Sequence, residues 1–452
     1  MKRRLYRLYN FIEVKPKDID NFSKEHLKGH IFQTSGWGNV KKDWVPKYIA
    51  GYDSNNNNMI LSCMMILRKI PKMTYYIGYI PRGFVADYNN KDLLIEFTEY
   101  LREFSKSNKV AFITIDPDIH LKEDEKLIYN SEKISGFLQS IGYNHKDSVN
   151  FEGIQPNFVF RLDLPTSEDK EAAKKKVFKN FSSKTRYNIR VAEERGLSYE
   201  TYDKSNITDE VLEEFHKIMV VTGKRDNFIT RNKEYFKEMI NDLFPFSRLY
   251  MIKYSYAKDL ERLTEKLKKQ QDANSRAVIK IEEIKKELLG DITEDKLEKL
   301  NKKLQDNENK LKESERQIEG FKNRMEDIKP YEGQEFYISG ALYLYYGGKA
   351  WYLYGASDDV LRDAMPNFLM QYAMINDSID LGCYLYDFRG VSGDLNPENP
   401  LYGLYKFKKG FNGKFVEFIG EFDLVIKKPI YNAFKYVFPR FKEIRSKLRN
   451  KK

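Results

Sequence analysis

Residues 258–329 form a 72-residue stretch without proline, and this stretch constrains the fold of the 452-residue chain more than any other feature. It contains 19 cations and 18 anions but a single aromatic residue, Phe321. Its apolar residues follow two heptad series with 3–4 spacing, which is typical of a coiled coil. The turn-like sequence LLGDITED separates the two series. We therefore expect two helices of about 30 residues, packed as an antiparallel hairpin about 45 Å long. The heptad positions are Leu260, Leu263, Leu267, Ala277, Ile281, Ile284 and Leu288, followed by Leu297, Leu300, Leu304, Leu311, Ile318, Phe321, Met325 and Ile328.

Outside this arm, short strand-like runs alternate with helical stretches. Strands are predicted for KYIAGYD, MILSCMMIL, AFITID, FVFRLDL and RLYMIKY, and helices for DLLIEFTEYLREFSKS, VLEEFHKIMVVTGK and AMPNFLMQYAMINDSIDLG. FYISGALYLYYGGKAWYLY predicts a β-hairpin that turns at Gly347 and Gly348. The order of helices and strands occurs once before Pro165 and again after it. The pattern indicates an α/β or α+β protein and is compatible with two similar modules, although no internal repeat can be aligned by eye.

The charge of the chain indicates an anionic partner. The net charge is +11, and because the arm carries only +1, the remaining 380 residues carry +10. Nucleic acid, a nucleotide-bearing precursor and an anionic membrane face all fit this excess. Cys63 and Cys383 are far apart in the sequence, so we expect two core residues in a reducing cytosol rather than a disulfide or a zinc site. The first 18 residues lack an apolar core, and the run Met59–Leu67 is about half the length of a membrane span, so a soluble or at most peripheral protein is expected.

Several familiar catalytic motifs are absent from the sequence. It contains no GxxxxGK[ST] loop, GxGxxG, GxSxG or HExxH motif. His26 and His30 have i,i+4 spacing, but without a third ligand nearby a surface or capping role is favoured over a metal site. A redox enzyme, a P-loop NTPase and a zinc hydrolase are therefore disfavoured, and we expect neither a cofactor nor a metal.

Two segments combine many cations with few acids. From Lys170 to Arg190 there are eight cations and one acid, interleaved with aromatic residues. Such a stripe can contact RNA phosphates. Helices that bury Val177, Phe181 and Ile189 and expose the lysines would give the same pattern, and this interpretation is favoured. The C-terminal residues 440–452 carry seven cations and one acid, and they can touch acidic lipid or RNA or form a frayed helix end.

The densest set of glycine, tyrosine, aspartate and lysine residues lies near the C-terminus, in WYLYGASDD, YDFRGVSGD and LYKFKKGFNGKFVEFIGEFDLVI. The motifs YGAS, YDFRG, FKKGF and IGEFDL resemble those of the FemABX family, tRNA-dependent aminoacyltransferases that build the peptidoglycan interpeptide bridge. The resemblance extends over FQTSGWGNVKKDW, PRGFVAD, TIDPD, KTRYNIRVAEERG and GKRDNFITRNKEYF. PRGF departs from the family pattern, because relatives often have proline after the glycine.

The resemblance implies two acetyltransferase-like (GNAT-like) modules with the precursor bound between them. Module 1 is expected at residues 1–155, with residues 420–452 packing back on it. Module 2 is expected at 156–419, with the coiled-coil arm inserted at 258–329.

The resemblance also implies site residues. The positions that hold the UDP-MurNAc-peptide or lie beside it are Lys41, Asp43, Arg231, Tyr235 and Tyr354. The aminoacyl end of the tRNA is expected at Phe407, Lys408 and Lys409.

The expected reaction needs no ATP loop, because an aminoacyl-tRNA ester is already activated. The ammonium of Lys408, expected to be charged at neutral pH, is the candidate that stabilises the developing oxyanion. Asp116 in TIDPD is a candidate general base, although Asp-Pro is also a common turn signal and a substrate group can accept the proton instead.

Alternatives remain at the level of substrate and of function. The acceptor is either lipid II, at the inner membrane face, or the soluble UDP-MurNAc-pentapeptide, and the donated residue is glycine, serine or alanine. A non-catalytic RNA-binding protein with a dimerising coiled coil is the alternative from another class. An acyl-CoA-dependent enzyme is disfavoured, because no glycine-rich pyrophosphate loop opens a helix. Whether the arm forms a homodimer or joins the protein to relatives stays open.

Overall fold

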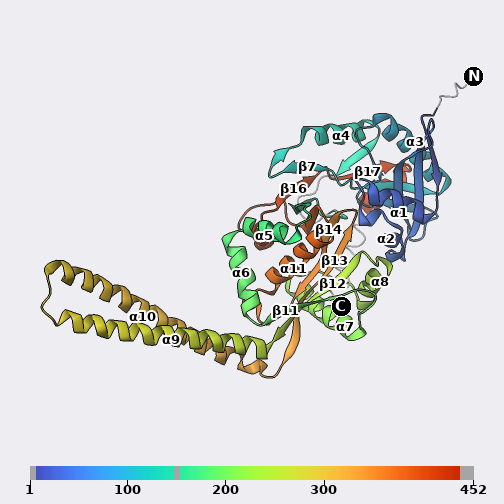
Figure 1. The fold of residues 1–452 in the computed structure, drawn as a ribbon. Helices are drawn as coiled ribbons and strands as arrows, with labels where there is room; N and C mark the ends of the chain where they lie inside the picture. Colours follow the sequence, from blue (N-terminus) through green and yellow to red (C-terminus); the bar gives the residue numbers. More distant parts are fainter. Residues whose placement is uncertain (1–6, 147–152, 438–452) are drawn as a thin grey trace, which may run out of the picture.

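The computed structural model describes residues 7–146 and 153–437, which form two β-sheet modules and a long helical arm (Figure 1). The expected α+β architecture, with two modules and an inserted helical arm, is confirmed. The strands and helices predicted from periodicity are all present.

The first sheet has the strand order β1-β2-β3-β4-β6-β17-β9, and β5 pairs with β3. Neighbouring strands are antiparallel except for β4 and β6, which are parallel and are connected through α3. The strands are β1 (Tyr9–Glu13), β2 (Val45–Asp53), β3 (Met59–Lys69), β4 (Tyr76–Ile80), β5 (Val85–Ala86), β6 (Val110–Ile115), β9 (Tyr143–Lys146) and β17 (Glu421–Val425).

The second sheet has the order β11-β12-β13-β14-β15-β10-β16-β7-β8. Its single parallel pair, β14 and β15, is connected through α11. Gly347 and Gly348 form the turn between β13 and β14, which confirms the predicted hairpin. The strands are β7 (His120–Glu123), β8 (Lys126–Leu127), β10 (Phe158–Asp163), β11 (Leu197–Tyr202), β12 (Ser247–Ser255), β13 (Glu335–Tyr346), β14 (Lys349–Ser357), β15 (Leu385–Gly390) and β16 (Lys414–Phe418).

The two sheets repeat one plan and exchange strands. In each sheet four antiparallel strands lead through a helix to a parallel fifth strand. The sixth position is filled by β17 in the first sheet, although β17 follows the second module in the sequence. In the second sheet that position is filled by β10, the first strand after the first module, and the β7–β8 hairpin joins beyond β16. The division into domains between residues 155 and 156 stays a prediction. Strands from each side of this boundary occur in both sheets.

The helices lie on the faces of the two sheets. Helices α3 and α4 pack on the first sheet, α5, α6 and α11 cover one face of the second, and α7 and α8 cover its other face. The helices are α1 (Pro16–Glu25), η1 (Ile31–Gln33), α2 (Ser35–Val40), α3 (Lys91–Ser107), α4 (Tyr129–Ser140), α5 (Lys170–Asn180), α6 (Ser183–Glu194), α7 (Asp209–Arg225), α8 (Lys233–Asp242), α9 (Tyr256–Leu288), α10 (Glu294–Ile328), η2 (Lys329–Tyr331), η3 (Arg362–Ala364), α11 (Pro366–Asp380), α12 (Tyr402–Lys409), α13 (Lys428–Asn432) and η4 (Ala433–Val437).

A shared apolar core joins the modules. Phe32, Trp37 and Met64 of the first module pack with Phe215 and Trp351 of the second in one cluster. Burying side chains of this size stabilises an interface by roughly 1.5–3 kcal/mol each. The two sheets therefore form one body rather than two loosely tethered domains.

Two smaller predictions are also confirmed. Val177 on α5, Phe181 directly after it and Ile189 on α6 are buried, which agrees with the packing interpretation of the basic stretch. Cys63 and Cys383 are buried and free.

Among the described residues, no helix is long and apolar enough to cross a bilayer. The basic segment 440–452 lies outside the described residues.

The arm is the predicted antiparallel hairpin of α9 and α10, and it projects from the second module (Figure 1). Leu263, Ile281, Ile284 and Leu300 are buried along its seam. Midway, small and polar heptad residues leave a groove, where Ser314 donates a hydrogen bond to the carbonyl of Gln270 at 3.4 Å. At its base, Arg324 pairs with the fully buried Asp259 at 3.4 Å.

Deleting the outer arm should leave the body folded. We predict that replacing residues 271–313 by a short Gly/Ser linker changes the free energy of unfolding by less than about 1 kcal/mol, a shift of roughly 2–4 °C in the melting temperature. The matched variant Arg324→Met leaves the buried Asp259 without its cation and, among the described residues, with only the hydrogen bond from Tyr254, so it should destabilise the protein more than the deletion does. Loss of the cooperative thermal transition in the deletion variant would show that the outer arm is part of the core.

Candidate functional site

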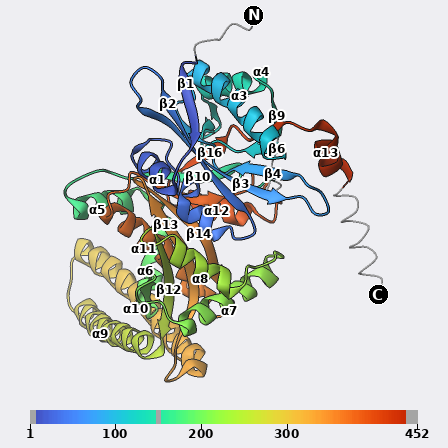
Figure 2. The same ribbon diagram turned by 90° about the vertical axis from the view of Figure 1, so that its right-hand side faces the viewer.

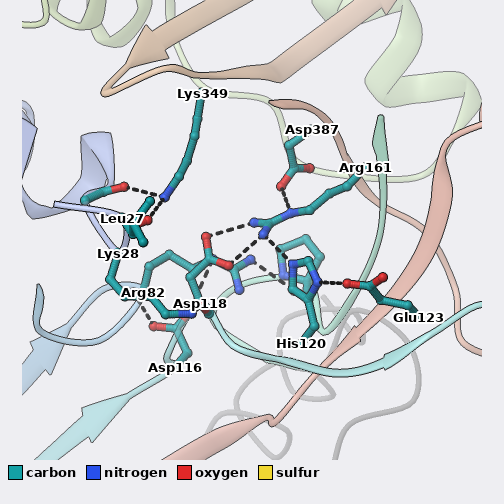
Figure 3. A network of polar contacts seen from close by, with 12 residues as sticks. Leu27, Lys28, Arg82, Asp116, Asp118, His120, Glu123, Arg161, Lys349 and Asp387 are labelled. Atoms are coloured by element: carbon teal, nitrogen blue, oxygen red, sulfur yellow. Dashed lines mark hydrogen bonds and ion pairs between the residues drawn. The ribbon is translucent and has the colours of Figure 1, made fainter. Parts of the chain in front are cut away.

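The side chain of Arg161 is the centre of a buried polar network between the two modules (Figure 3). Its Nη1 and Nη2 donate to Asp118 at 2.7 and 2.9 Å, and its Nε donates to Asp387 at 3.0 Å. Asp118 follows β6 of the first sheet, whereas Asp387 lies on β15 of the second and is the cross-strand neighbour of Arg161. Burial alone would raise the pKa of Asp118, but the charge and hydrogen bonds of Arg161 hold it well below its usual range. One guanidinium therefore binds a carboxylate from each module.

His120 extends this network toward the surface. Arg161 Nη1 donates to His120 Nε2 at 2.7 Å, so the proton of the neutral ring lies on Nδ1, which donates to Glu123 at 2.8 Å. Burial and the charge of Arg161 lower the pKa of His120. The ring is thus held neutral and oriented by its two partners.

Lys349 ties the second module to the loop after α1. Its Nζ donates to the carbonyls of Leu27 and Gly29 at 2.6 and 2.9 Å, and burial lowers its pKa to about 8. Lys28 of the same loop donates to the carbonyl of Asp118 at 3.2 Å. A cleft of about 260 Å³ opens beside these cations and Arg161.

Two further buried arginines, Arg82 and Arg389, face the same interface. Both have left-handed backbone conformations, with φ of 58° and 62°. The amide N–H of Arg82 donates to Asp116 at 2.7 Å, and that of Arg389 donates to Asp387 at 2.6 Å. Such conformations cost of order 1–3 kcal/mol in a non-glycine residue, and the two carboxylates offset this cost.

Two of these guanidinium groups share one aromatic ring. Arg82 and Arg161 lie over the ring of Phe418, with Cζ 4.4 and 4.8 Å from its centroid. Arg82 Nε and Arg389 Nη1 have no hydrogen-bond acceptor among the described residues. Burial and the nearby charge of Arg82 lower the pKa of Arg389 to about 10. The interface therefore holds desolvated cations with donors available to an anion.

The carboxyl of Asp116 lies beside Arg82 in this interface. Only 4% of the residue is exposed, its Oδ2 is 3.8 Å from Arg82 Nε, and no hydrogen bond reaches Oδ2 within residues 7–146 and 153–437. Burial raises the pKa of Asp116 to about 7, with Glu421 adding to the rise and Arg82 opposing it. A carboxylate with this pKa accepts a proton near neutral pH, as a general base must.

Lys408 is buried, and its surroundings change the charge that was expected for its ammonium. Its Nζ donates to the carbonyls of Arg389 and Gly390 at 3.2 and 2.7 Å, and 3% of the residue is exposed. Burial lowers its pKa to about 7, with Arg389 lowering it further and Asp387 opposing. The prediction that this ammonium is fully charged at neutral pH is wrong, because desolvation disfavours the charged form.

A second cationic cluster joins α2 of the first module to α8 of the second. Lys41 Nζ donates to the hydroxyl of Tyr235 at 3.0 Å, and Arg231 lies over the same ring at 5.2 Å. Tyr354 packs edge-on against Tyr235, with ring centroids 6.3 Å apart. Burial and the charge of Arg231 lower the pKa of Lys41 to about 8. The structure thus brings Lys41, Arg231, Tyr235 and Tyr354 together.

An aromatic stack connects the two clusters. Lys41 lies over Trp37 at 4.5 Å, Trp37 stacks on Phe32 at 4.0 Å, and Arg389 lies over Phe32 at 5.3 Å. Buried Gln33 positions this segment by hydrogen bonds to the backbone of Met64 and to the carbonyl of Pro81. The two cationic clusters therefore belong to one continuous site.

The remaining predicted residues lie at its margins. Asp43 is exposed and makes no hydrogen bond or ion pair within the described parts of the chain, so the structure does not bring it to Lys41. Phe407 packs edge-on against Phe368 and Phe411 at 4.9 and 5.5 Å. Lys409 is exposed, with Nζ 5.4 Å from the ring centroid of Tyr405.

Sequence reasoning missed most of the interface charges. Arg82, Arg161, Lys349, Asp387 and Arg389 all lie in quoted motifs or predicted strands, yet none was selected. A charged residue inside an apolar strand could have identified Arg161, which lies in FVFRLDL. Side chains alternate along a strand, so Arg161 shares a face with Val159, which is buried.

The described residues contain no cluster of potential metal ligands. His26 Nδ1 and His30 Nδ1 accept hydrogen bonds from the backbone N–H of Lys28 and Phe32, both at 3.0 Å. His30 therefore caps η1, which agrees with the capping alternative, whereas the side chain of His26 binds the loop after α1.

Comparisons with known proteins give a consistent result over nearly the whole chain. The model of the FemAB family matches residues 14–438. Lipid II:glycine glycyltransferase of Staphylococcus aureus (strain MSSA476) is 29% identical over 448 residues, covering 97% of this chain and 98% of that protein. The enzyme of the same name from Staphylococcus epidermidis (strain ATCC 12228 / FDA PCI 1200) is 31% identical over 440 residues, covering 96% of each. The crystal structure of FemX superposes with a TM-score of 0.69 at 28% identity, covering 94% of this chain and 99% of that one.

The Arg161 network should be essential for stability. Arg161→Met leaves Asp118 and Asp387 buried without their cation, and we predict a loss of about 3–5 kcal/mol in the free energy of unfolding at pH 7. Lys266→Met, which breaks the exposed pair with Glu194, should cost less than about 1 kcal/mol.

The same variants test the electrostatic cause through pH. In the wild type, Asp118 contributes stability above its unfolded pKa near 3.8, and this contribution is lost as pH falls through the lower folded pKa. In Arg161→Met the buried carboxyl of Asp118 binds a proton at higher pH, because burial raises its pKa once Arg161 is gone, so the deficit measured by denaturant unfolding should shrink between pH 7 and 4. A deficit that stays constant over this range would indicate lost packing rather than lost charge.

Proposed function

Because the chain belongs to the FemAB family, we propose that it transfers an amino acid from an aminoacyl-tRNA to the stem peptide of lipid II in the synthesis of the peptidoglycan interpeptide bridge. The observation that carries the proposal is the similarity, over nearly their full length, to relatives named lipid II:glycine glycyltransferase. These names favour glycine over serine or alanine as the donated residue, and lipid II over UDP-MurNAc-pentapeptide as the acceptor. The enzyme would work at the cytoplasmic face of the membrane.

The proposed reaction is an aminolysis of an ester. The amine of the stem peptide, or of a residue already added to it, attacks the carbonyl carbon of the aminoacyl ester. The new C–N bond forms, the ester C–O bond breaks, and the tRNA leaves with a free ribose hydroxyl. The amine loses one proton and the leaving oxygen gains one. The protein must therefore accept a proton and stabilise a transient oxyanion.

Asp116 and Lys408 are proposed for these two tasks. Burial brings both pKa values to about 7, so at neutral pH the carboxylate and the ammonium are each present in a substantial fraction. Lys408 is bound to the backbone of Arg389, and Arg389 and Arg82 each have an unpaired donor in the interface. We propose that these cations together hold the charge that develops on the carbonyl oxygen.

The Lys41 cluster is proposed to bind the anionic part of the acceptor. The nearby charge of Arg231 helps to lower the pKa of Lys41. Among the described residues, no acidic side chain forms an ion pair with Lys41 or Arg231. An anion would relieve this repulsion, and a diphosphate fits two converging cations. The aromatic rings of Trp37, Tyr235 and Tyr354 fix the geometry.

The basic stretch of α5 and α6 is proposed to bind the tRNA. The carbonyl of Gly410, directly after α12, accepts a hydrogen bond from the N–H of Ser182 between α5 and α6 at 2.9 Å. This contact places the exposed Lys179 and Lys184 beside the helix that carries Phe407 and Lys409. Exposed Tyr187 supplies a ring on the same surface, on which a base can stack.

A transfer assay tests the proposal. Labelled glycyl-, seryl- or alanyl-tRNA is offered with detergent-solubilised lipid II or with UDP-MurNAc-pentapeptide, and the product mass is recorded. We expect one glycyl residue to be added to lipid II, and no product from free glycine and ATP or from ribonuclease-treated donor. Folded protein that transfers nothing to either acceptor, nor to lipid II already carrying one glycine, would refute the function.

The rate of transfer should depend on pH as a bell centred near pH 7. The rate rises as Asp116 loses its proton and falls as Lys408 loses its own, because each group is active in its charged form. Asp116→Asn should lower the rate by about 10²–10⁴ and remove the acidic limb. Lys408→Met should lower it by about 10²–10³ and remove the alkaline limb. Exposed Lys126→Gln is the control, and an unchanged acidic limb in Asp116→Asn would exclude Asp116 as the base.

A further inference from the structure

Three segments of the first module carry many exposed cations and no acid. They are residues 68–77 at the β3–β4 turn, residues 108–112 at the start of β6, and residues 425–435 around α13. We refer to their surface as the basic face. Its exposed cations are Arg68, Lys69, Lys72, Lys109, Lys427, Lys428 and Lys435.

Backbone and ring contacts hold these segments together. The N–H of Tyr76 donates to the carbonyl of Lys109 at 2.9 Å, and the N–H of Lys427 donates to the carbonyl of Ala111 at 2.8 Å. The rings of Phe112 and Phe434 lie 5.3 Å apart. The β3–β4 turn and α13 protrude on the same side of the molecule (Figure 2). The seven cations therefore belong to one surface and not to three separate ones.

Apolar groups lie among these cations. Pro71 and Pro429 are exposed, Met73 and Ile430 are partly exposed, and 37% of Phe434 is exposed. Met73 and Ile430 pack against a small separate core that contains Ile70 and Tyr431. Apolar side chains ringed by lysines suit the boundary between lipid headgroups and acyl chains.

The basic face is continuous with the Lys41 cluster. Arg68 lies over the ring of Trp44 at 5.7 Å, and the N–H of Trp44 donates to the carbonyl of Lys41 at 2.8 Å. Val45, which follows, is 52% exposed. One surface thus leads from the lysine-rich turn to the two cations of the proposed diphosphate site.

We propose that the basic face rests on a bilayer containing anionic lipid and presents the Lys41 cluster to lipid-linked substrate. The reason for the contact depends on the proposed function, because a lipid-linked acceptor keeps its lipid in the membrane while its diphosphate reaches Lys41 and Arg231. RNA is a less favoured partner of this face for two reasons. The surface proposed for tRNA, beside Phe407 and Lys409, lies on the second module. The prolines and the methionine of the basic face would also add nothing to phosphate binding.

Vesicle sedimentation with the full chain tests the contact without any substrate. The vesicles are phosphatidylcholine with or without phosphatidylglycerol. The variant Lys69→Gln/Lys72→Gln/Lys428→Gln removes three charges from the basic face, and Lys268→Gln/Lys269→Gln/Lys302→Gln removes three exposed charges from the arm as a matched control. Residues 440–452 are identical in both, so their cations cannot cause a difference between them.

The wild type and the arm variant should bind anionic vesicles equally. The basic-face variant should bind on the order of 100-fold more weakly, because each lysine near such a surface contributes roughly fivefold. None of the three should bind neutral vesicles strongly. Equal binding by both variants, or no binding by the wild type, would overturn the proposal. Unchanged vesicle binding with weakened tRNA binding in the basic-face variant would overturn it in favour of RNA.

Transfer in detergent separates this inference from the proposed function. The basic-face variant should transfer to detergent-solubilised lipid II at the wild-type rate and to lipid II in anionic vesicles more slowly. If the wild type transfers in detergent but does not bind vesicles, the membrane contact fails and the function stands. If it binds vesicles through the basic face but transfers nothing, the function fails and the contact stands.

Discussion

The bond of Arg161 to two aspartates is the interaction on which the rest of the interface depends. Asp118 comes from the end of a strand in the first sheet and Asp387 from the parallel strand of the second, and the guanidinium binds both out of water. A buried ion pair gains little over apolar packing, but removing one partner is costly. Because each sheet region supplies one carboxylate, loss of Arg161 would leave an unpaired buried charge on both sides of the interface. The entry of β17 into the first sheet, and of β7 and β8 into the second, also links the two sheets.

The charges assembled around this bond shift one another's proton affinities. Five buried cations, Arg82, Arg161, Lys349, Arg389 and Lys408, share the interface with Asp116, Asp118 and Asp387. Arg161 binds Asp118 and Asp387 by charged hydrogen bonds. Asp116 lies 3.8 Å from Arg82, and Lys408 donates to backbone carbonyls; both have pKa values of about 7. Desolvation is the main cause in both cases, because burial disfavours the charged form of either group.

Local patterns in the sequence predicted most elements of the fold. The heptad pattern predicted the arm, and the alternation of apolar and polar residues predicted the strands. Gly347 and Gly348 predicted the turn between β13 and β14. Periodicity cannot reveal that β17 enters the first sheet, since strand exchange is decided by pairing between distant segments. For the same reason residues 120–127 were not expected beside β16.

The candidate site was predictable only in part. Lys41, Arg231, Tyr235 and Tyr354 were selected through a family resemblance and meet in space, whereas Asp43 faces solvent. The ionisation of Lys408 was not predictable, because a pKa depends on burial and neighbouring charges that only the folded chain supplies. Arg161 was missed because its partners are 43 and 226 residues away in the sequence.

The central claim is that burial in the closed interface lowers the pKa of Lys408 to about 7. Titration of the ¹³Cε resonances of labelled lysine measures this directly, with Lys408→Met providing the assignment. The account predicts a lysine that titrates near pH 7 and vanishes in the variant, below the two expected near pH 8 for Lys41 and Lys349. If every lysine resonance titrates near its ordinary value of 10.5, the interface does not desolvate Lys408 and the account is contradicted.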